Sequence, residues 1–171
     1  MMDILKKNYF DLFGIEVSIE VNKNTLDQKY NNLQQQFHPD KYINSSNHEK
    51  SLALQISSHI NDGYVILGDL IKRINYIFEI NNFHKDEAET FKDEEFLLEQ
   101  ISFNEFISNL NENNTEEINS YQNDIILKIK TSITDIKTFY SKRDFDRMWN
   151  VFCKLRFYVK HVNELKDKLT A

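Results

Sequence analysis

The feature that most constrains this chain is how little glycine and proline it contains. Its 171 residues include three glycines and one proline, and neither type occurs from Asp69 to Ala171. Turns in that stretch must be made by Asn, Asp and Ser, whose side chains hydrogen-bond to nearby backbone. A chain with so few helix breakers favours long helices, so we predict an all-α fold.

The composition sets the class of protein. At 40% hydrophobic, with thirteen Phe and eight Tyr, the chain can bury a core in one domain or in two small ones. Its single cysteine, Cys153, excludes an internal disulfide and a cysteine-based zinc site. The sequence has no apolar run of about 18 residues and no leader pattern at its N-terminus. We therefore expect a soluble cytoplasmic protein that does not enter a membrane.

The net charge of −6 is unevenly distributed along the chain. Between Lys85 and Asp124 there are twelve acidic residues and two lysines, a balance that repels phosphate backbones and disfavours nucleic-acid binding. Between Lys142 and Lys168 there are eight basic and four acidic residues. We expect the basic helix to lie beside the acidic one in the same bundle.

Apolar spacing predicts an antiparallel helical hairpin in the first half. The stretch "NYFDLFGI" is typical of a short helix that ends at Gly14. Behind Asn22, a good N-cap, four apolar residues recur at helical spacing: Leu26, Tyr30, Leu33 and Phe37. This predicts a helix over residues 23–37, and the period resumes from Leu52 to Leu67. Two long helices joined by a polar loop pack side by side.

The only proline, Pro39, lies between His38 and Asp40 in the loop of this hairpin. One interpretation is structural, because proline cannot continue a helix. The other is recognition, because polar side chains on a loop held by packed helices are well placed to meet a partner. Catalysis is disfavoured, since a hairpin tip has no cavity that excludes water. A metal site would need His48 or His59 as well, and His-x-Asp alone supplies too few ligands.

Several motifs together resemble one family. "FHPDK" between two such helices, "YFDLFGI" before them and "INDGYVILGD" in the second helix look like a J-domain, and with the later "FLLEQI" the chain resembles the HscB family. The resemblance implies that His38, Pro39 and Asp40 dock on a DnaK/HscA-type ATPase chaperone and stimulate its ATP hydrolysis. Nearby lysines, Lys29 and Lys41, are implied to assist docking. It also implies that the protein is not an enzyme, and we expect no cofactor and no metal.

The resemblance implies two domains, and the second half supports them. Residues 1–80 would form the J-domain and residues 81–92 a linker. Residues 93–171 are expected to form a three-helix bundle, with helices from about Asp93 to Leu110, from about Glu116 to Tyr140 and after "SKRD". The two domains are expected to be arranged as an L. Because the chain starts at the J-domain, it is similar to the bacterial members of the family.

The first helix of the bundle has two apolar faces on a helical wheel of about 100° per residue. The first face is the core stripe: Phe96, Phe103, Ile107 and Leu110. Leu97, Leu98 and Ile101 form the second face, which should meet solvent unless another element covers it. It could pack on the J-domain or bind a partner. The resemblance implies the second, because these positions match the surface by which HscB holds the cluster scaffold protein IscU.

Two further residues are expected to belong to the scaffold-binding surface. Glu105 shares the second face, and Phe157, in the last helix, lies off the stripe predicted for the core and matches a client-binding phenylalanine of the family. The alternative for Phe157 is ordinary half-buried packing. Two rival interpretations of the whole surface stay open. It could hold a different client of a generic J-protein, or it could form a dimer, although we expect a monomer.

Overall fold

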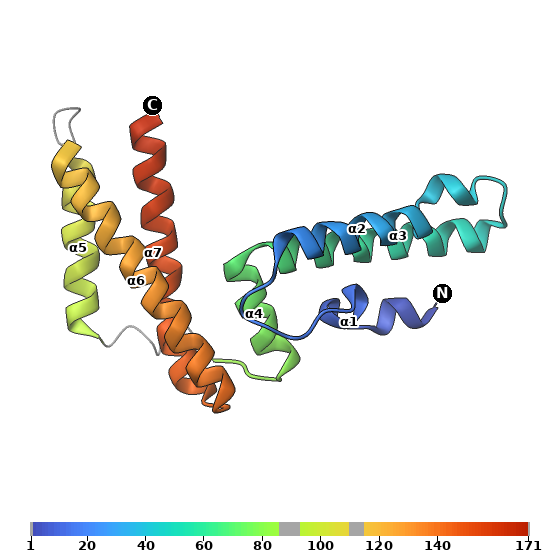
Figure 1. The fold of residues 1–171 in the computed structure, drawn as a ribbon, viewed down its shortest axis with the longest axis horizontal. Coiled ribbons are helices and arrows are strands. Elements are labelled where there is room, and N and C mark those ends of the chain that lie inside the picture. The colour runs from blue at the N-terminus through green and yellow to red at the C-terminus, as the bar shows by residue number, and fades with distance from the viewer. Residues whose placement is uncertain (1, 86–92, 110–114, 171) are drawn as a thin grey trace. The chain divides into compact units, whose positions relative to one another are not determined.

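The computed structural model describes residues 2–85, 93–109 and 115–170, and every regular element in these ranges is helical (Figure 1). The all-α prediction is therefore confirmed. The chain divides into two compact units, Met1–Asn82 and Phe83–Ala171. Part of the predicted linker, residues 86–92, and the core residue Leu110 lie outside the described residues. Among the helices that are described, none is both long and apolar enough to cross a bilayer.

The N-terminal unit is a helical hairpin with shorter helices packed on it. Its elements are η1 (Met2–Lys6), α1 (Tyr9–Phe13), α2 (Lys23–Phe37), η2 (Pro39–Tyr42), α3 (Asn47–Gly68) and α4 (Leu70–Ile80). Figure 1 shows α2 and α3 running side by side, joined by the loop that contains η2. The predicted α1, α2 and their hairpin partner are confirmed, and α2 has the predicted boundaries.

Side-chain caps set the ends of these helices. Asn22 accepts a hydrogen bond from the Thr25 backbone N–H at 3.1 Å, as an N-cap should. Gly14 ends α1 in the left-handed conformation, with φ of 59°, which glycine adopts without steric cost. The apolar period of α3 was predicted to resume at Leu52, after a polar loop. The helix itself begins at Asn47, because Ser46 and Glu49 form a capping box ahead of the first apolar residue.

Helix α1 packs closely on α3 because Gly63 has no side chain. A Cβ atom there would lie 2.6 Å from Tyr9 Cδ1, closer than real Cβ contacts, and 3.0 Å from Phe13 Cε2, which is also tight. Tyr76 in α4 holds the other side of Tyr9, since its hydroxyl accepts a hydrogen bond from the Tyr9 N–H at 3.0 Å. The short α1 is thus fixed between α3 and α4.

A buried arginine joins the corner between α3 and α4 to the segment before α2. Arg73 Nε donates to the Ile19 carbonyl at 3.0 Å, and its Nη1 donates to the Leu67 carbonyl. Burial lowers the pKa of this guanidinium, although Asp69 and Glu20 oppose the shift. Arg73 thus gives both backbone carbonyls a hydrogen-bond donor in a buried position.

The C-terminal unit contains the three predicted helices, α5 (Glu94–Ser108), α6 (Thr115–Ser141) and α7 (Phe145–Thr170). Helices α6 and α7 form an antiparallel pair, and α5 packs against them. Five buried residues make the centre of one core cluster: Phe96, Phe103, Ile125, Tyr158 and Leu165. The predicted core residues of α5 that are described, including Ile107, pack in this cluster.

Phe157 corrects one prediction. The wheel placed it away from the core, but it is half-buried and packs on the core cluster, with its ring edge-on to Phe96 at 5.4 Å between centroids. The apolar stripe predicted for α7 is the side of the helix that packs against α6. Because α5 covers a different flank of α7, Phe157 falls under α5, as the packing alternative supposed.

The acidic and basic helices lie side by side, as predicted. Lys154 in α7 contacts Asp93, the N-cap of α5, with 2.6 Å between Nζ and Oδ2. Lys128 in α6 bridges Glu99 of α5 at 2.5 Å and Asp124 of its own helix at 2.8 Å. These pairs tie α5 to both neighbours and set its rotation about its axis.

Candidate functional site

The His-Pro-Asp triplet joins two helical elements and keeps its polar groups exposed. Pro39 begins η2, and His38 before it has extended backbone angles, φ −60° and ψ 129°, so α2 ends at Phe37. His38 Nδ1 accepts a hydrogen bond from the Asp40 N–H at 3.3 Å. The His38 and Asp40 side chains are 53% and 78% exposed. Pro39 therefore stops the helix and also holds two exposed polar groups in one local arrangement.

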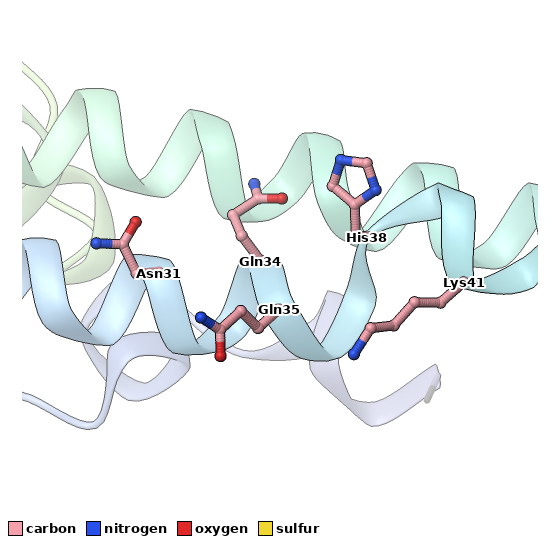
Figure 2. Close-up of a pocket in the computed structure, with 5 residues that line it drawn as sticks. All are labelled: Asn31, Gln34, Gln35, His38 and Lys41. Carbon is pink, nitrogen blue, oxygen red and sulfur yellow. The ribbon is translucent and has the colours of Figure 1, made fainter.

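An open groove of about 480 Å³ lies beside the triplet (Figure 2). It is lined by Asn31, Gln34 and Gln35 of α2 together with His38 and Lys41 of the loop. Gln34 is held in place, because its amide donates to Asn61 Oδ1 at 2.6 Å and accepts from Ser57 Oγ at 3.4 Å. The groove is thus built on the seam where α2 packs against α3.

The lysines predicted for docking do not gather in one place. Lys41 lines the groove. Lys29 has its Nζ 3.8 Å from the position a Gly14 Cβ would take, so its ammonium lies beside the C-terminal end of α1. The other lysine of α2, Lys23, was not predicted for docking; it is 3.7 Å from Asp27 and lies over the Tyr64 ring. The structure therefore brings His38 and Lys41 together but places Lys29 elsewhere.

The second apolar face of α5 is exposed. Leu97, Leu98 and Ile101 are 41%, 64% and 54% exposed, and Glu105 on the same face is exposed as well. Asp93 fixes this orientation, since its Oδ1 accepts from the Phe96 N–H at 3.0 Å while its Oδ2 pairs with Lys154. With Phe96 turned into the core, the three aliphatic residues must face outward. Their exposure agrees with the helical wheel.

Phe157 contributes less free surface than these three residues. Its ring is half-buried against Phe96, so it can offer a partner only the part that the core does not cover. Truncating it would disturb the core cluster as well as any bound partner. Leu98 and Ile101 are therefore the cleaner probes of binding at this face.

A polar network behind α5 was missed by the sequence analysis. Glu99 Oε2 accepts from the Tyr158 hydroxyl at 3.3 Å, and its other oxygen pairs with Lys128. Burial, and then the Glu99 carboxylate, raises the pKa values of Tyr158 and Tyr121 to about 12. Burial disfavours charged Lys128, but its hydrogen bonds with Asp124 and Glu99 outweigh this and raise its pKa. Tyr158, Tyr121 and Lys128 therefore keep their protons at neutral pH, and none of these three groups is a general base there.

Metal and thiol chemistry find no support in the described part of the chain. Within residues 2–85, 93–109 and 115–170, no group of three or more His, Cys, Asp or Glu side chains is arranged to hold a metal ion. Cys153 is buried in the helical bundle. His59 is half-buried, and its Nε2 lies 3.3 Å from the Lys7 carbonyl.

Comparison with known proteins identifies the family. The model of a family described as "HSCB C-terminal oligomerisation domain" matches residues 92–166. "Co-chaperone protein HscB" of Buchnera aphidicola subsp. Acyrthosiphon pisum (strain Tuc7) is 32% identical over 164 residues, covering 94% of this chain and 94% of the relative. The chain belongs to the HscB co-chaperone family. A further member, "Co-chaperone protein HscB homolog" of Mannheimia succiniciproducens, is 31% identical and covers 95% of this chain and 97% of its own length.

Solved structures show the same fold. "Chaperone HscB from Vibrio cholerae" superposes with a TM-score of 0.82 at 22% identity, covering 94% of this chain and 96% of the other. The human co-chaperone protein HscB superposes with a TM-score of 0.85 at 23% identity, covering 95% of this chain and 82% of the human one. The helical fold is therefore shared along nearly the whole of this chain.

Proposed function

We propose that this protein is a co-chaperone that docks on an HscA-type ATPase chaperone and stimulates its ATP hydrolysis. The observation that carries the proposal is the exposed, locally ordered His38-Pro39-Asp40 loop in a member of the HscB family. Pro39 limits the conformations of the loop, so less entropy is lost on docking. His38 and Asp40 supply directional polar contacts, and Lys41 a positive charge. Lys29 would contribute its charge from a different place, beside the C-terminal end of α1.

The second half of the proposal concerns the client. The exposed face of α5, with Leu97, Leu98, Ile101 and Glu105, would hold an IscU-type scaffold protein together with the solvent-accessible part of Phe157. Exposed aliphatic residues grouped on one helix are typical of protein-binding surfaces. The protein would work as a cytoplasmic monomer without a cofactor of its own, and it would assist iron–sulfur cluster assembly and transfer.

Both proposed binding sites, one for the chaperone and one for the scaffold, are carried by the same chain. A scaffold held by α5 is kept near the chaperone that the His38 loop engages, which raises its effective concentration there. Client delivery and stimulation of ATP hydrolysis would then be coupled. The protein itself would catalyse nothing.

Two variants separate the two sites. We expect His38→Gln to abolish stimulation of the chaperone's steady-state ATP hydrolysis while it leaves scaffold binding, measured by calorimetry, unchanged. We expect Leu98→Ala to weaken scaffold binding by about fivefold or more, the loss of a hot-spot side chain. Leu54→Ala is the matched control, because Leu54 is an equally exposed leucine on α3.

The same assays distinguish the alternatives. If His38→Gln also abolished scaffold binding in a folded protein, the division between the two sites would be wrong. Stimulation that requires His38 but ignores the scaffold would instead favour a J-protein with another client. Self-association that is lost in Leu98→Ala, measured by sedimentation, would favour a dimer at the α5 face.

A further inference from the structure

The α6–α7 pair has one side that points away from α5. On α6, Lys128 points toward α5, because its ammonium pairs with Glu99. On α7, His161 points toward α5, because its ring stacks on Phe103. At about 100° per residue, positions about 140–160° from Lys128 or His161 lie on the opposite side of their helix. We call this side, within residues 126–133 of α6 and 156–166 of α7, the α6–α7 rear face: Ile126, Lys130, Ile133, Arg156, Val159, Asn163 and Lys166.

The rear face is open to solvent and contains aliphatic surface. Lys128 lies over the Tyr158 ring at 5.8 Å, so these parts of α6 and α7 run beside each other. Ile126 is 44% exposed, and Ile133 and Val159 are half-buried. The two lysines, the arginine and the asparagine of the rear face are all exposed. A partner that covers the aliphatic side chains therefore meets cationic groups around them.

The rear face is positive because the carboxylates of the two helices lie on other sides. Asp124 and Glu164 belong to the half of their helix that faces α5, where both form ion pairs with lysines. The carboxylates of α6 and α7 nearest to the rear face, Glu116 and Asp167, lie about 60° away from its centre around the helix axis. The rear face thus carries three cationic residues and no acidic one, in a chain whose net charge is −6.

An acidic protein helix fits this surface better than other anions do. The rear face extends about 15 Å along α7, the length of about three helical turns. A DNA duplex carries one negative charge per about 1.7 Å and would be repelled by the acidic stretch between Lys85 and Asp124. A lipid surface needs a broader apolar area than two isoleucines and a valine. An amphipathic helix with carboxylates beside its aliphatic stripe matches both the apolar part and the charge.

We propose that the α6–α7 rear face binds an acidic amphipathic helix of a partner protein. The aliphatic stripe of that helix packs on Ile126, Ile133 and Val159, and its carboxylates pair with the three cationic residues. This binding is independent of the proposed chaperone docking and scaffold binding. Because the rear face points away from α5, the chain can hold the acidic partner while a scaffold occupies the exposed face of α5.

The test measures binding of the full chain to a fluorescent synthetic peptide by anisotropy at low salt. The peptide has about four helical turns, with leucines at helical spacing and glutamates on both sides of the leucine stripe. Lys130→Glu and Arg156→Glu should each raise its dissociation constant about three- to tenfold, and Ile126→Ala should raise it about threefold. Lys168→Glu is the matched control, because Lys168 is an exposed lysine of α7 on the side of α5, and it should bind as wild type does.

Four results would overturn the proposal. The first is no measurable binding of the peptide by wild type. The second is an equal loss in Lys168→Glu and Lys130→Glu, which would mean that only the overall charge matters. The third is binding that survives Lys130→Glu and is lost in Leu98→Ala, which would place the peptide on α5. The fourth is tighter binding of duplex DNA or of anionic lipid vesicles than of the peptide, abolished by Lys130→Glu, which would assign the rear face to another class of partner.

Discussion

His161 should make the C-terminal unit sensitive to mild acid. It is 3% exposed, and its ring stacks on Phe103 with 3.5 Å between centroids. Within the described residues its buried Nδ1 has no hydrogen-bond partner. Burial lowers the pKa of this imidazole to about 4, with Glu164 opposing the shift and Lys160 and Lys128 adding to it. The folded protein therefore keeps His161 neutral in a range where an unfolded histidine gains a proton.

The sign and size of the effect follow from linkage. An unfolded histidine titrates near 6.5, so between that pH and 4 the unfolded chain binds a proton that the folded chain does not. Stability is therefore lost as the pH falls through this window. Lowering the pH from about 7 to about 5 should cost about 2 kcal/mol through this residue alone. His161→Phe should abolish this pH-dependent loss of stability, because phenylalanine keeps a ring against Phe103 and does not titrate.

Trp149 provides a specific assay. It is the only tryptophan of the chain and is buried in the C-terminal unit, so its fluorescence during urea unfolding reports on that unit. Wild type should lose about 2 kcal/mol more than His161→Phe between the two pH values. His48→Gln, an exposed histidine in α3, should behave as wild type. Equal pH dependence in wild type and His161→Phe would refute the reasoning, as would an NMR titration that gives His161 a pKa near 6.5.

Four substitutions test the packing described above. Gly63→Ala should destabilise the N-terminal unit by about 1–3 kcal/mol, because the added Cβ meets Tyr9 at 2.6 Å, and denaturant unfolding followed by circular dichroism would show it. Arg73→Met should cost about 2 kcal/mol in the same assay, since it removes the two buried hydrogen bonds that Arg73 donates to the Ile19 and Leu67 carbonyls; an unchanged midpoint would contradict this. Leu98→Ala should change stability by less than about 0.5 kcal/mol, whereas Phe103→Ala should cost about 3–5 kcal/mol by Trp149 fluorescence. A large loss in Leu98→Ala would mean that the α5 face is structural.

Helices with a regular apolar period could be predicted from the sequence. The spacing of Leu26, Tyr30, Leu33 and Phe37 gave α2 its boundaries, and the wheel of α5 separated Phe96 and Phe103 from the exposed leucines. The start of α3 and the short α4 were harder, because their first turns depend on polar caps, Ser46 and Asp69, rather than on apolar spacing. Both caps are visible in the sequence. Weighing them would have found these two boundaries.

What depends on contacts between distant segments could not be predicted. Phe157 packs against Phe96, and His161 stacks on Phe103; both partners lie about sixty residues away in the sequence, so a wheel of α7 alone misplaced Phe157 and gave no reason to expect that His161 is buried. The position of the Lys29 ammonium depends on how α1 packs against the hairpin. The exposure of His38 and Asp40 at the tip of the hairpin was easier to predict, because their hydrogen bond joins residues only two positions apart in the sequence. The L-shaped arrangement of the two domains and the partners themselves stay predictions.

The measurement that tests the account most directly is the ATP hydrolysis rate of an HscA-type chaperone with this protein, in the presence and absence of an IscU-type scaffold. We predict that the scaffold increases stimulation by wild type, that Leu98→Ala loses this increase but keeps the basal stimulation, and that His38→Gln loses both. If the scaffold made no difference to wild type, or if Leu98→Ala responded to it as wild type does, the claim that one chain couples client delivery to ATP hydrolysis would be contradicted.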